Sequence, residues 1–343
     1  MRFRPLRQTA PYRGEPIVMP DPPDVMRAAV IDAPGEASAL HEASVPVPSP
    51  VLSELLVRVV AAGVNPIDAK TRAGKGLSSA IPAYPAVLGY DFSGIVVQSP
   101  YESHAFPPGT EVFGMLPFPR SGGSYAEYAV VPTLSVARKP ASLSHVEAAG
   151  VPLAALTAWG LVVETAHAHE GQRVLIHAGS GGVGHFAVQI AAYFGAQVTA
   201  TGSKGNAAWL RELGASNVVD YTSEKFEDAV ADVDVVIDLV GNAHENTGSR
   251  SLSVLRRGGL YVVVPTGSFP GYREAAAAAG VRATSFKVVP DGTALATVGR
   301  LLDSGAVQVY IDRVFELAEA AEAHAELEKG HTRGKIVLHV GDD

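Results

Sequence analysis

Arg173-Val-Leu-Ile-His-Ala-Gly-Ser-Gly-Gly-Val-Gly184 is the stretch of this sequence that decides its fold. A short apolar strand precedes Gly179, Gly181 and Gly184, which have G-x-G-x-x-G spacing, and a helical pattern covers residues 183–194. In such a unit the first glycine makes a tight turn, the second lets the backbone approach a pyrophosphate, and the third packs helix against strand. The helix N-terminus supplies unpaired N–H groups for the anion. Because strand and helix flank the glycines, we predict a dinucleotide site.

Strands and helices alternate from this stretch onward. Apolar strands are expected at residues 173–178, 197–201, 217–220, 233–239 and 259–264, and helices at residues 154–166, 183–194, 205–213 and 247–256. Such alternation predicts an α/β fold with a doubly wound parallel sheet. The apolar residues 281–289 are expected as the last strand, at the sheet edge.

The first third of the chain has a different pattern. Residues 26–139 are rich in short strands separated by Pro and Gly, which mark turns and predict a small, partly closed β-barrel-like unit. A closing strand, residues 334–340, is expected to rejoin that unit. We therefore expect an N-terminal extension (1–25), a discontinuous β-rich domain (26–146 and 290–343) and a dinucleotide-binding domain (147–289).

Composition excludes several classes of function. The chain of 343 residues has no cysteine, so a disulfide framework, a thiolate nucleophile and a cysteine-based zinc site are excluded. Its net charge, 27 − 35 = −8, is spread without long runs of one sign, and its apolar stretches are too short for a membrane span. We expect a cytoplasmic protein that acts on a small molecule, with no nucleic-acid or membrane partner.

Several motifs resemble the zinc-independent quinone oxidoreductase branch, which includes zeta-crystallin, of the medium-chain dehydrogenase/reductase superfamily. Besides the glycine loop, the matching segments are residues 62–74, 88–94, 123–128, 155–159 and 331–338. The resemblance covers residues 26–340. It implies a GroES-like β-barrel domain beside a Rossmann-type domain, and a homodimer assembled through the cofactor domain, where residues 281–289 offer a free sheet edge.

The departures from this superfamily concern the metal. Zinc-dependent alcohol dehydrogenases of the superfamily have a cysteine ligand where Asn65 stands and a histidine where Tyr90 stands, and amide and phenol groups do not make a zinc site. No metal is expected, and reduction of an electron-poor acceptor then demands less of the site than alcohol oxidation. The resemblance makes Asn65 and Tyr90 the candidate catalytic residues beside the nicotinamide. Asp68 and Tyr125 are candidate substrate contacts.

The loop after the second sheet strand favours NADP(H) over NAD(H). An NAD site has an acid there for the ribose 2′-hydroxyl, whereas this chain has Ser203 and Lys204, which suit a 2′-phosphate. The family pattern adds Tyr221, and more weakly His331, to the phosphate site. The full set expected to bind the cofactor is Gly179, Ser180, Gly181, Gly182, Val183, Gly184, Ser203, Lys204, Tyr221, Gly241 and His331.

Three functions stay open on these residues. The favoured one is NADPH-dependent hydride transfer to a quinone or another electron-poor carbonyl acceptor without zinc. The second is reduction of the double bond of an enone or alkenal. The third is a non-catalytic NADPH-binding protein. An enoyl-thioester reductase is disfavoured, because residues 74–80 contain no tyrosine to act as proton donor.

Overall fold

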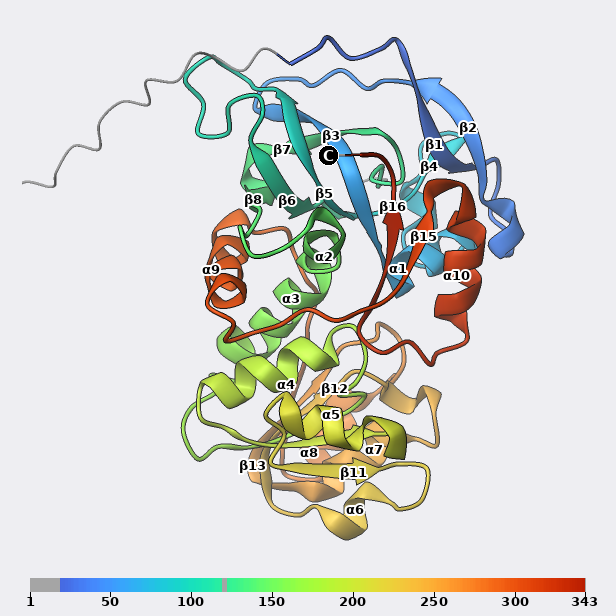
Figure 1. Ribbon diagram of the computed structural model, residues 1–343. Helices are drawn as coiled ribbons and strands as arrows, with labels where there is room; N and C mark the ends of the chain where they lie inside the picture. The colour runs from blue at the N-terminus through green and yellow to red at the C-terminus, as the bar shows by residue number, and fades with distance from the viewer. Residues whose placement is uncertain (1–18, 119–121, 343) are drawn as a thin grey trace, which may run out of the picture.

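The computed structural model describes residues 19–118 and 122–342, so most of the expected extension lies outside the described residues. Two sheet-based halves lie one above the other in Figure 1, with the N-terminal and C-terminal strands together in the upper half. The lower half is formed by the middle of the chain. A single cluster of buried apolar side chains extends through both halves.

The lower half is a six-stranded sheet in which every pair is parallel, with strand order β11-β10-β9-β12-β13-β14. Its strands are β9 (Arg173–Ile176), β10 (Gln197–Gly202), β11 (Asn217–Asp220), β12 (Val233–Asp238), β13 (Leu255–Val263) and β14 (Arg282–Ser285). This order reverses direction beside β9, as in a doubly wound dinucleotide-binding sheet. The predicted α/β fold is confirmed, and β14 is the edge strand expected from residues 281–289.

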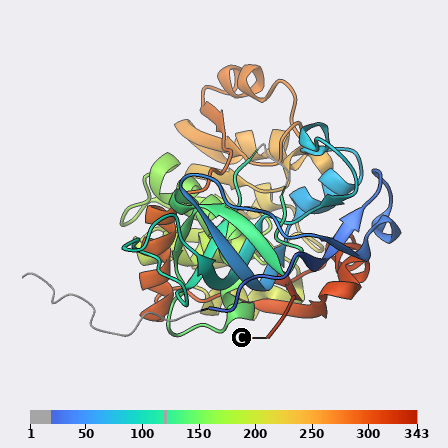
Figure 2. The same cartoon turned by 90° about the horizontal axis from the view of Figure 1, so that it is seen from above.

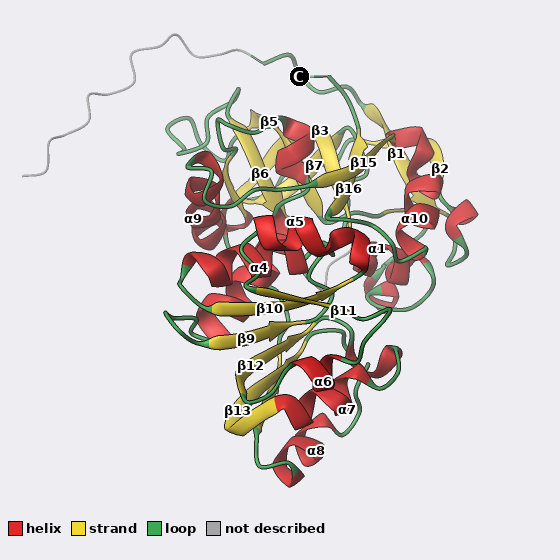
Figure 3. Cartoon of the chain, turned by 60° about the horizontal axis from the view of Figure 1, so that its bottom comes forward, coloured by secondary structure: helices red, strands yellow, loops and turns green. Residues whose placement is uncertain are grey.

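Helices cover both faces of this sheet (Figure 3). One face has α4 (Gly184–Tyr193) and α5 (Ala207–Glu212). The other has α6 (Phe226–Ala229), α7 (Thr247–Ser251) and α8 (Tyr272–Ala278). Two layers of helices therefore protect a sheet whose central strands are buried on both sides.

Three expected elements are corrected by the structure. The helix expected at residues 247–256 ends at Ser251, because β13 begins at Leu255 and pairs with β12 from Val233 onward. The last strand is shorter than residues 281–289, because the chain leaves the sheet at Phe286, whose ring packs directly against Gly160. The helix expected at residues 154–166 is α3 (Pro152–Trp159) followed by a π-helical turn, Gly160–Thr165.

The upper half contains two sheets. A seven-stranded sheet has the order β15-β16-β3-β5-β6-β8, with β7 paired to β3, and a three-stranded sheet has the order β2-β1-β4. The strands are β1 (Val25–Ile31), β2 (His41–Pro46), β3 (Glu54–Val64), β4 (Ala86–Val87), β5 (Asp91–Gln98), β6 (Glu111–Met115), β7 (Tyr128–Pro132), β8 (Val136–Arg138), β15 (Ile311–Glu316) and β16 (Lys335–His339). Since β16 pairs antiparallel with β3, the C-terminal strand rejoins the first part of the chain as predicted.

Among the described residues, four further α-helices belong to this half and its junction with the lower one. They are α1 (Pro66–Arg72), α2 (His145–Ala149), α9 (Gly292–Asp303) and α10 (Ala320–Glu328). Helices α9 and α10 lie on opposite sides of the seven-stranded sheet in both views (Figure 1, Figure 2). The residue directly before β16 reaches the lower half, because Gly334 N donates a hydrogen bond of 2.9 Å to Ser180 O. The glycine loop and the upper sheet therefore meet at this junction.

Candidate active site

The three glycines of the loop differ in whether the packing of the fold requires them. A Cβ built on Gly184 would lie 2.1 Å from Ala178 O, and one on Gly179 would lie 2.9 Å from Ala200 Cβ, so both positions need glycine for packing. The nearest atom to a Cβ on Gly181 is 3.4 Å away. Gly181 is therefore not required by the protein's own packing, and in dinucleotide sites the glycine at this place lets the ligand approach the backbone closely.

At the carboxyl edge of the sheet, the loop after β10 supplies a hydroxyl and one basic group, and Arg333 adds a second basic group. Lys204 is exposed, Ser203 is half-buried, and Asn206 Nδ2 donates to Ser203 Oγ at 3.2 Å. Arg333 joins this loop from the other half: its Nε donates to Asn206 Oδ1 at 2.8 Å and its Nη2 to Gly205 O at 3.1 Å. The loop is therefore basic, as a phosphate site requires.

Arg333 is the residue that sequence reasoning missed at this loop. Its guanidinium lies 5.0 Å from the Trp209 ring centroid and 5.7 Å from that of Tyr310, so aromatic rings hold it in place. His331, the basic residue expected here, is exposed two positions upstream. Tyr221, also expected here, is 60% exposed, and its backbone N donates to Gly202 O at 3.3 Å. Arg333 therefore contacts the loop in the structure, and cofactor binding by His331 and Tyr221 stays a prediction.

The remaining members of the expected cofactor set lie at the glycine loop or in the turn after β12. Val183 directly precedes α4, and Ser180 and Gly182 face the end of β16 through Gly334. Gly241 follows β12, has a φ of 68°, and donates its N–H to Asp238 Oδ1 at 2.8 Å. A side chain at Gly241 would collide with Ser268, so this glycine is explained by the turn alone.

Asn65 is the centre of a buried polar cluster at the junction of the two halves. It directly precedes α1, and its backbone N donates to Asp68 Oδ2 at 2.8 Å. Its side-chain Nδ2 donates to Asp91 Oδ2 at 2.9 Å, and its Oδ1 accepts a short hydrogen bond from Lys335 Nζ. Asp91 Oδ1 in turn accepts from Leu153 N at 2.8 Å. The position of Asn65 is thus determined by one cation and one anion.

Asp68 and Tyr125, the expected substrate contacts, are fully buried and bonded to each other. Tyr125 OH donates to Asp68 Oδ2 at 3.2 Å and lies 3.1 Å from His324 Nε2, on α10. Beyond them, Arg72 Nη2 lies 2.5 Å from Glu328 Oε1. Both candidates therefore belong to the same buried cluster as Asn65. Substrate contact by either residue stays a prediction.

Burial dominates the electrostatics of this cluster. It raises the pKa of Asp68 to about 7 and that of Asp91 to about 6, although hydrogen bonds to Asp68 and the neighbouring ammonium of Lys335 oppose these shifts. Burial likewise lowers the pKa of Lys335, against the attraction of Asp91 and Asp68. The pKa of Tyr90 is raised, first by burial and then by the charge of Asp68, so its hydroxyl stays protonated. Strongly shifted carboxyl groups at a junction are typical of functional sites.

Tyr90 lies beside this cluster and is also buried. Its ring packs edge-on against Phe118, with 4.6 Å between the centroids. The neighbouring Gly89 has a φ of 89°, and a Cβ there would lie 2.2 Å from the Tyr125 ring. Gly89 therefore lets the Tyr125 ring pack against the backbone directly before Tyr90. A direct contact of Tyr90 with acceptor or cofactor stays a prediction.

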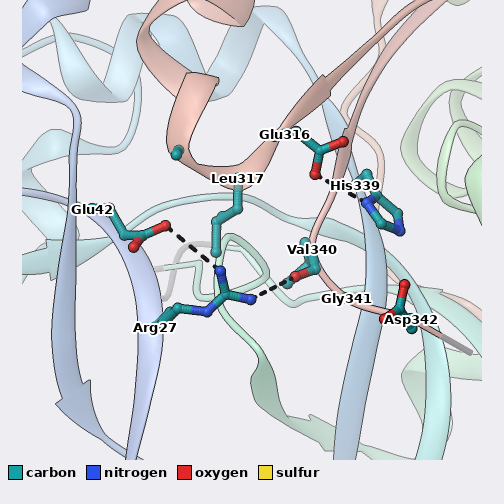
Figure 4. Close-up of a pocket in the computed structure, with 9 residues that line it drawn as sticks. Arg27, Glu42, Glu316, Leu317, His339, Val340, Gly341 and Asp342 are labelled. Carbon is teal, nitrogen blue, oxygen red and sulfur yellow. Dashed lines mark hydrogen bonds and ion pairs between the residues drawn. The ribbon is translucent and has the colours of Figure 1, made fainter.

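A surface hollow at the far end of β16 is separate from this cluster (Figure 4). It is lined by Arg27, Glu42, Glu316, Leu317, Ala318, His339, Val340, Gly341 and Asp342. Arg27 lies 4.0 Å from Glu42 and His339 lies 3.1 Å from Glu316, so charged groups in it pair with one another. The hollow contains none of the candidate site residues.

Two further findings concern metals and membranes. Within residues 19–118 and 122–342, no three His, Asp or Glu side chains are arranged to hold a metal ion. None of the helices in those ranges combines the length and the apolar character that crossing a bilayer requires.

Two family models match this chain. The alcohol dehydrogenase GroES-like domain matches residues 52–141, and a zinc-binding dehydrogenase model matches residues 213–338. The first matched region falls in the upper half, and the second runs from β11 through the lower sheet to β15 and β16 of the upper half. The description of the second model names zinc, although the position of Asn65 has neither cysteine nor histidine.

Relatives and solved structures resemble nearly the whole chain. The mitochondrial NAD(P)H oxidoreductase RTN4IP1 of Danio rerio is 33% identical, over 93% of this chain and 92% of its own length. The 2-methylene-furan-3-one reductase of Solanum lycopersicum is 38% identical, over 87% of this chain and 74% of its own length. The structure of the quinone oxidoreductase from Coxiella burnetii has a TM-score of 0.87 and 37% identity, covering 92% of this chain and all of that one. The chain therefore belongs to the medium-chain dehydrogenase/reductase superfamily, in its quinone oxidoreductase branch, and is an NAD(P)H oxidoreductase.

Proposed function

We propose that this protein transfers hydride from NADPH to a quinone or another electron-poor carbonyl acceptor without zinc. One observation carries the proposal: the Lys335 side chain connects the glycine loop to Asn65. A Cβ on Gly182 would lie 3.2 Å from Lys335 Cδ, while the Nζ of the same side chain bonds to Asn65 Oδ1. The loop that fits a pyrophosphate and the candidate catalytic amide are therefore one side chain apart.

The residues present fit NADPH. Gly181 has no side chain to block the approach of a pyrophosphate, and Ser203, Lys204 and Arg333 offer a hydroxyl and two positive charges to a 2′-phosphate. The nearby acid Asp220 is engaged by Thr222 Oγ1 at 2.7 Å and Ser223 Oγ at 3.0 Å. It is therefore a poor partner for a ribose 2′-hydroxyl, which supports NADPH over NADH.

The residues present do not fit zinc. At the position of a zinc-ligating cysteine, Asn65 presents an amide whose oxygen is already bonded to an ammonium group. Zinc prefers thiolate, imidazole or carboxylate ligands, and a second cation beside Lys335 would be repelled. We therefore assign no step of the reaction to a metal.

Asn65 and Tyr90 are the proposed hydrogen-bond donors of the reaction. When bound, NADPH supplies the hydride, and negative charge develops on the acceptor oxygen. The Asn65 amide has one hydrogen bonded to Asp91 and a second that no other described residue accepts, so the second hydrogen can bond the acceptor. Tyr90 is the second proposed donor, and Asp68 and Tyr125 line the site. The final proton comes from water, so no side chain has to be an essential acid.

Reduction of an enone double bond is the second candidate function. It is supported by the relative named a 2-methylene-furan-3-one reductase, since that name describes a conjugated carbonyl compound. The same donors would stabilise the enolate oxygen that forms when hydride adds to the β-carbon. The two reactions differ in the acceptor atom that receives hydride. A single panel that contains both kinds of acceptor can therefore distinguish them.

Consumption of NADPH with a panel of acceptors tests both candidates. We expect oxidation of NADPH with 1,4-benzoquinone and 9,10-phenanthrenequinone, in enzyme shown by metal analysis to lack zinc. Turnover with crotonaldehyde or an alkenal but with no quinone would select the enone reductase. NADPH binding without turnover of any acceptor would select the non-catalytic alternative. Stoichiometric zinc would contradict the metal-free reaction.

Assembly, domain limits and location are further parts of this proposal. Pairing of β14, an edge strand, with its copy in a second chain would extend the sheet into a homodimer. Light scattering should give twice the mass of one chain.

The domain limits at residues 146, 147, 289 and 290 remain proposed boundaries. We propose a cytoplasmic location, although one relative is named mitochondrial.

A further inference from the structure

Lys335 is a buried lysine that lies between the glycine loop and Asn65. It is the first residue of β16, its side chain is 3% exposed, and its Nζ donates to Val64 O at 3.0 Å and to Asn65 Oδ1. Asp91 Oδ2 lies 3.8 Å from Nζ, beyond direct hydrogen-bond distance. Removing an ammonium from water costs several kcal/mol, so a lysine in this position calls for an explanation.

A purely structural ion pair explains the arrangement poorly. A buried pair is often no more stabilising than apolar side chains of the same size. Here the ammonium also makes its short contact with the amide oxygen of Asn65, while the carboxylate accepts from the amide nitrogen of the same side chain. The two charges therefore act on the two ends of one amide.

These contacts determine which way the Asn65 amide points. In the opposite orientation, the amide N–H groups would face the ammonium and the amide oxygen would face the Asp91 carboxylate. Both contacts would be repulsive, whereas both are attractive as observed. Lys335 and Asp91 thus hold an N–H of Asn65 available for donation. A cation bonded to the amide oxygen also polarises the amide and makes that N–H a stronger donor.

We propose that Lys335 is the positioning residue of the hydride-transfer site: it orients and polarises the Asn65 amide, so that its free N–H stabilises the negative charge on the acceptor oxygen. This inference rests on the proposed function. Lys335 keeps its proton throughout and touches neither acceptor nor hydride. The acceptor gains hydride from NADPH and one proton from water, and NADP⁺ is released.

The first test is Lys335→Met, which preserves side-chain length and removes the charge. We expect kcat with 1,4-benzoquinone to fall at least about tenfold, while the Kd for NADPH, measured by fluorescence titration, changes less than about threefold. Lys329→Met, at an exposed lysine of the same chain segment, should leave both quantities unchanged. A wild-type kcat in Lys335→Met would overturn the inference, as would equal losses in kcat and NADPH affinity.

The absence of cysteine in this chain allows a rescue experiment. In Lys335→Cys, alkylation with 2-bromoethylamine in denaturant followed by refolding creates a side chain nearly identical to lysine, whereas iodoacetamide creates a neutral one. We expect the ammonium-bearing product to recover kcat to within about threefold of the wild type and the neutral product to stay low. Equal recovery by both products would show that only the volume of the side chain matters.

A double variant covers the case in which Lys335→Met does not fold because it leaves Asp91 unpaired. Lys335→Met with Asp91→Asn removes both buried charges, and thermal melting reports whether it folds. Its kcat should still be at least about tenfold below that of the wild type, since the cation is missing. A wild-type kcat in this variant would overturn the inference. If the wild type itself reduces no quinone and no enone, the proposed function fails together with the inference. If the wild type is active and the Lys335 variants have the same kcat, the inference alone fails.

Discussion

The two ends of the proposed cofactor site are built in opposite ways. At the loop after β10, Lys204 and Tyr221 are exposed and follow the strands that present them directly. At the junction of the halves, Asn65, Asp91 and Lys335 are buried and come from three distant segments. At the exposed end, loss of one basic side chain should have a modest effect, because water solvates the remaining charges. At the buried end, each charge is compensated by another, so the loss of one leaves its partner uncompensated. Substitutions should therefore have graded effects at the first end and severe effects at the second.

The largest effect is expected from Asp91→Ala at the buried end. This change removes the acceptor of Asn65 Nδ2 and Leu153 N and leaves the Lys335 ammonium without its carboxylate. The free energy of unfolding should fall by about 3–5 kcal/mol, measured by urea denaturation. Asp21→Ala, at an exposed carboxylate, should change it by less than about 0.5 kcal/mol. If the two variants were equally stable, the buried charges would not be energetically coupled.

The second prediction uses the pKa of Asp68. Burial raises it to about 7, whereas the same group in the unfolded chain titrates near ~3.9. Between these values the folded protein retains a proton that the unfolded chain has released, so stability falls as the pH rises. The full effect is about 4 kcal/mol, at ~1.4 kcal/mol per pKa unit.

Asp68→Asn should remove this contribution and flatten the decline in unfolding free energy between about pH 4 and about pH 7. Asp91, whose pKa burial raises to about 6, continues to contribute in both proteins. An unchanged slope in the variant would show that Asp68 is ionised in the folded protein.

The exposed end of the site could be predicted from the sequence, whereas the contacts of the buried end could not. The glycine loop, β10 and the basic loop after it are adjacent in sequence, so local periodicity and spacing were enough to predict them. Lys335 and Asn65 are 270 positions apart, and no local pattern predicts their contact. Two signals were present in the sequence: a charged residue stands at the start of each of two apolar strands, Lys335 in β16 and Asp91 in β5. Arg333 was missed because the ring stacking that holds it depends on the fold.

Gly181→Ala tests the glycine loop between the two ends. The added Cβ would lie 3.4 Å from its nearest neighbour, so the fold should tolerate it, but a methyl group would occupy the approach to the pyrophosphate. The Kd for NADPH should rise at least about tenfold, with unchanged thermal melting. Gly341→Ala, with a nearest neighbour at 3.9 Å, is the control and should bind NADPH normally. Normal binding by Gly181→Ala would place the pyrophosphate elsewhere.

A smaller effect is expected at the exposed end. NADPH should bind at least about tenfold more tightly than NADH, and Lys204→Ala should weaken NADPH by less than that factor while leaving NADH almost unchanged, because Arg333 still offers a positive charge. Fluorescence titration with both nucleotides measures the ratio, and Lys225→Ala is the control at another exposed lysine. Equal dissociation constants for NADPH and NADH in the wild type would contradict the assignment of the loop.

The central claim is that the acceptor is reduced beside Asn65, and kcat of Asn65→Ala tests it most directly. NADPH oxidation should be followed at saturating NADPH with 1,4-benzoquinone, 9,10-phenanthrenequinone and crotonaldehyde. We expect kcat to fall at least about tenfold on each acceptor that the wild type reduces, without complete loss, because water supplies the proton and the cofactor remains bound. A variant that retained the full wild-type kcat on every such acceptor would show that the reaction takes place elsewhere.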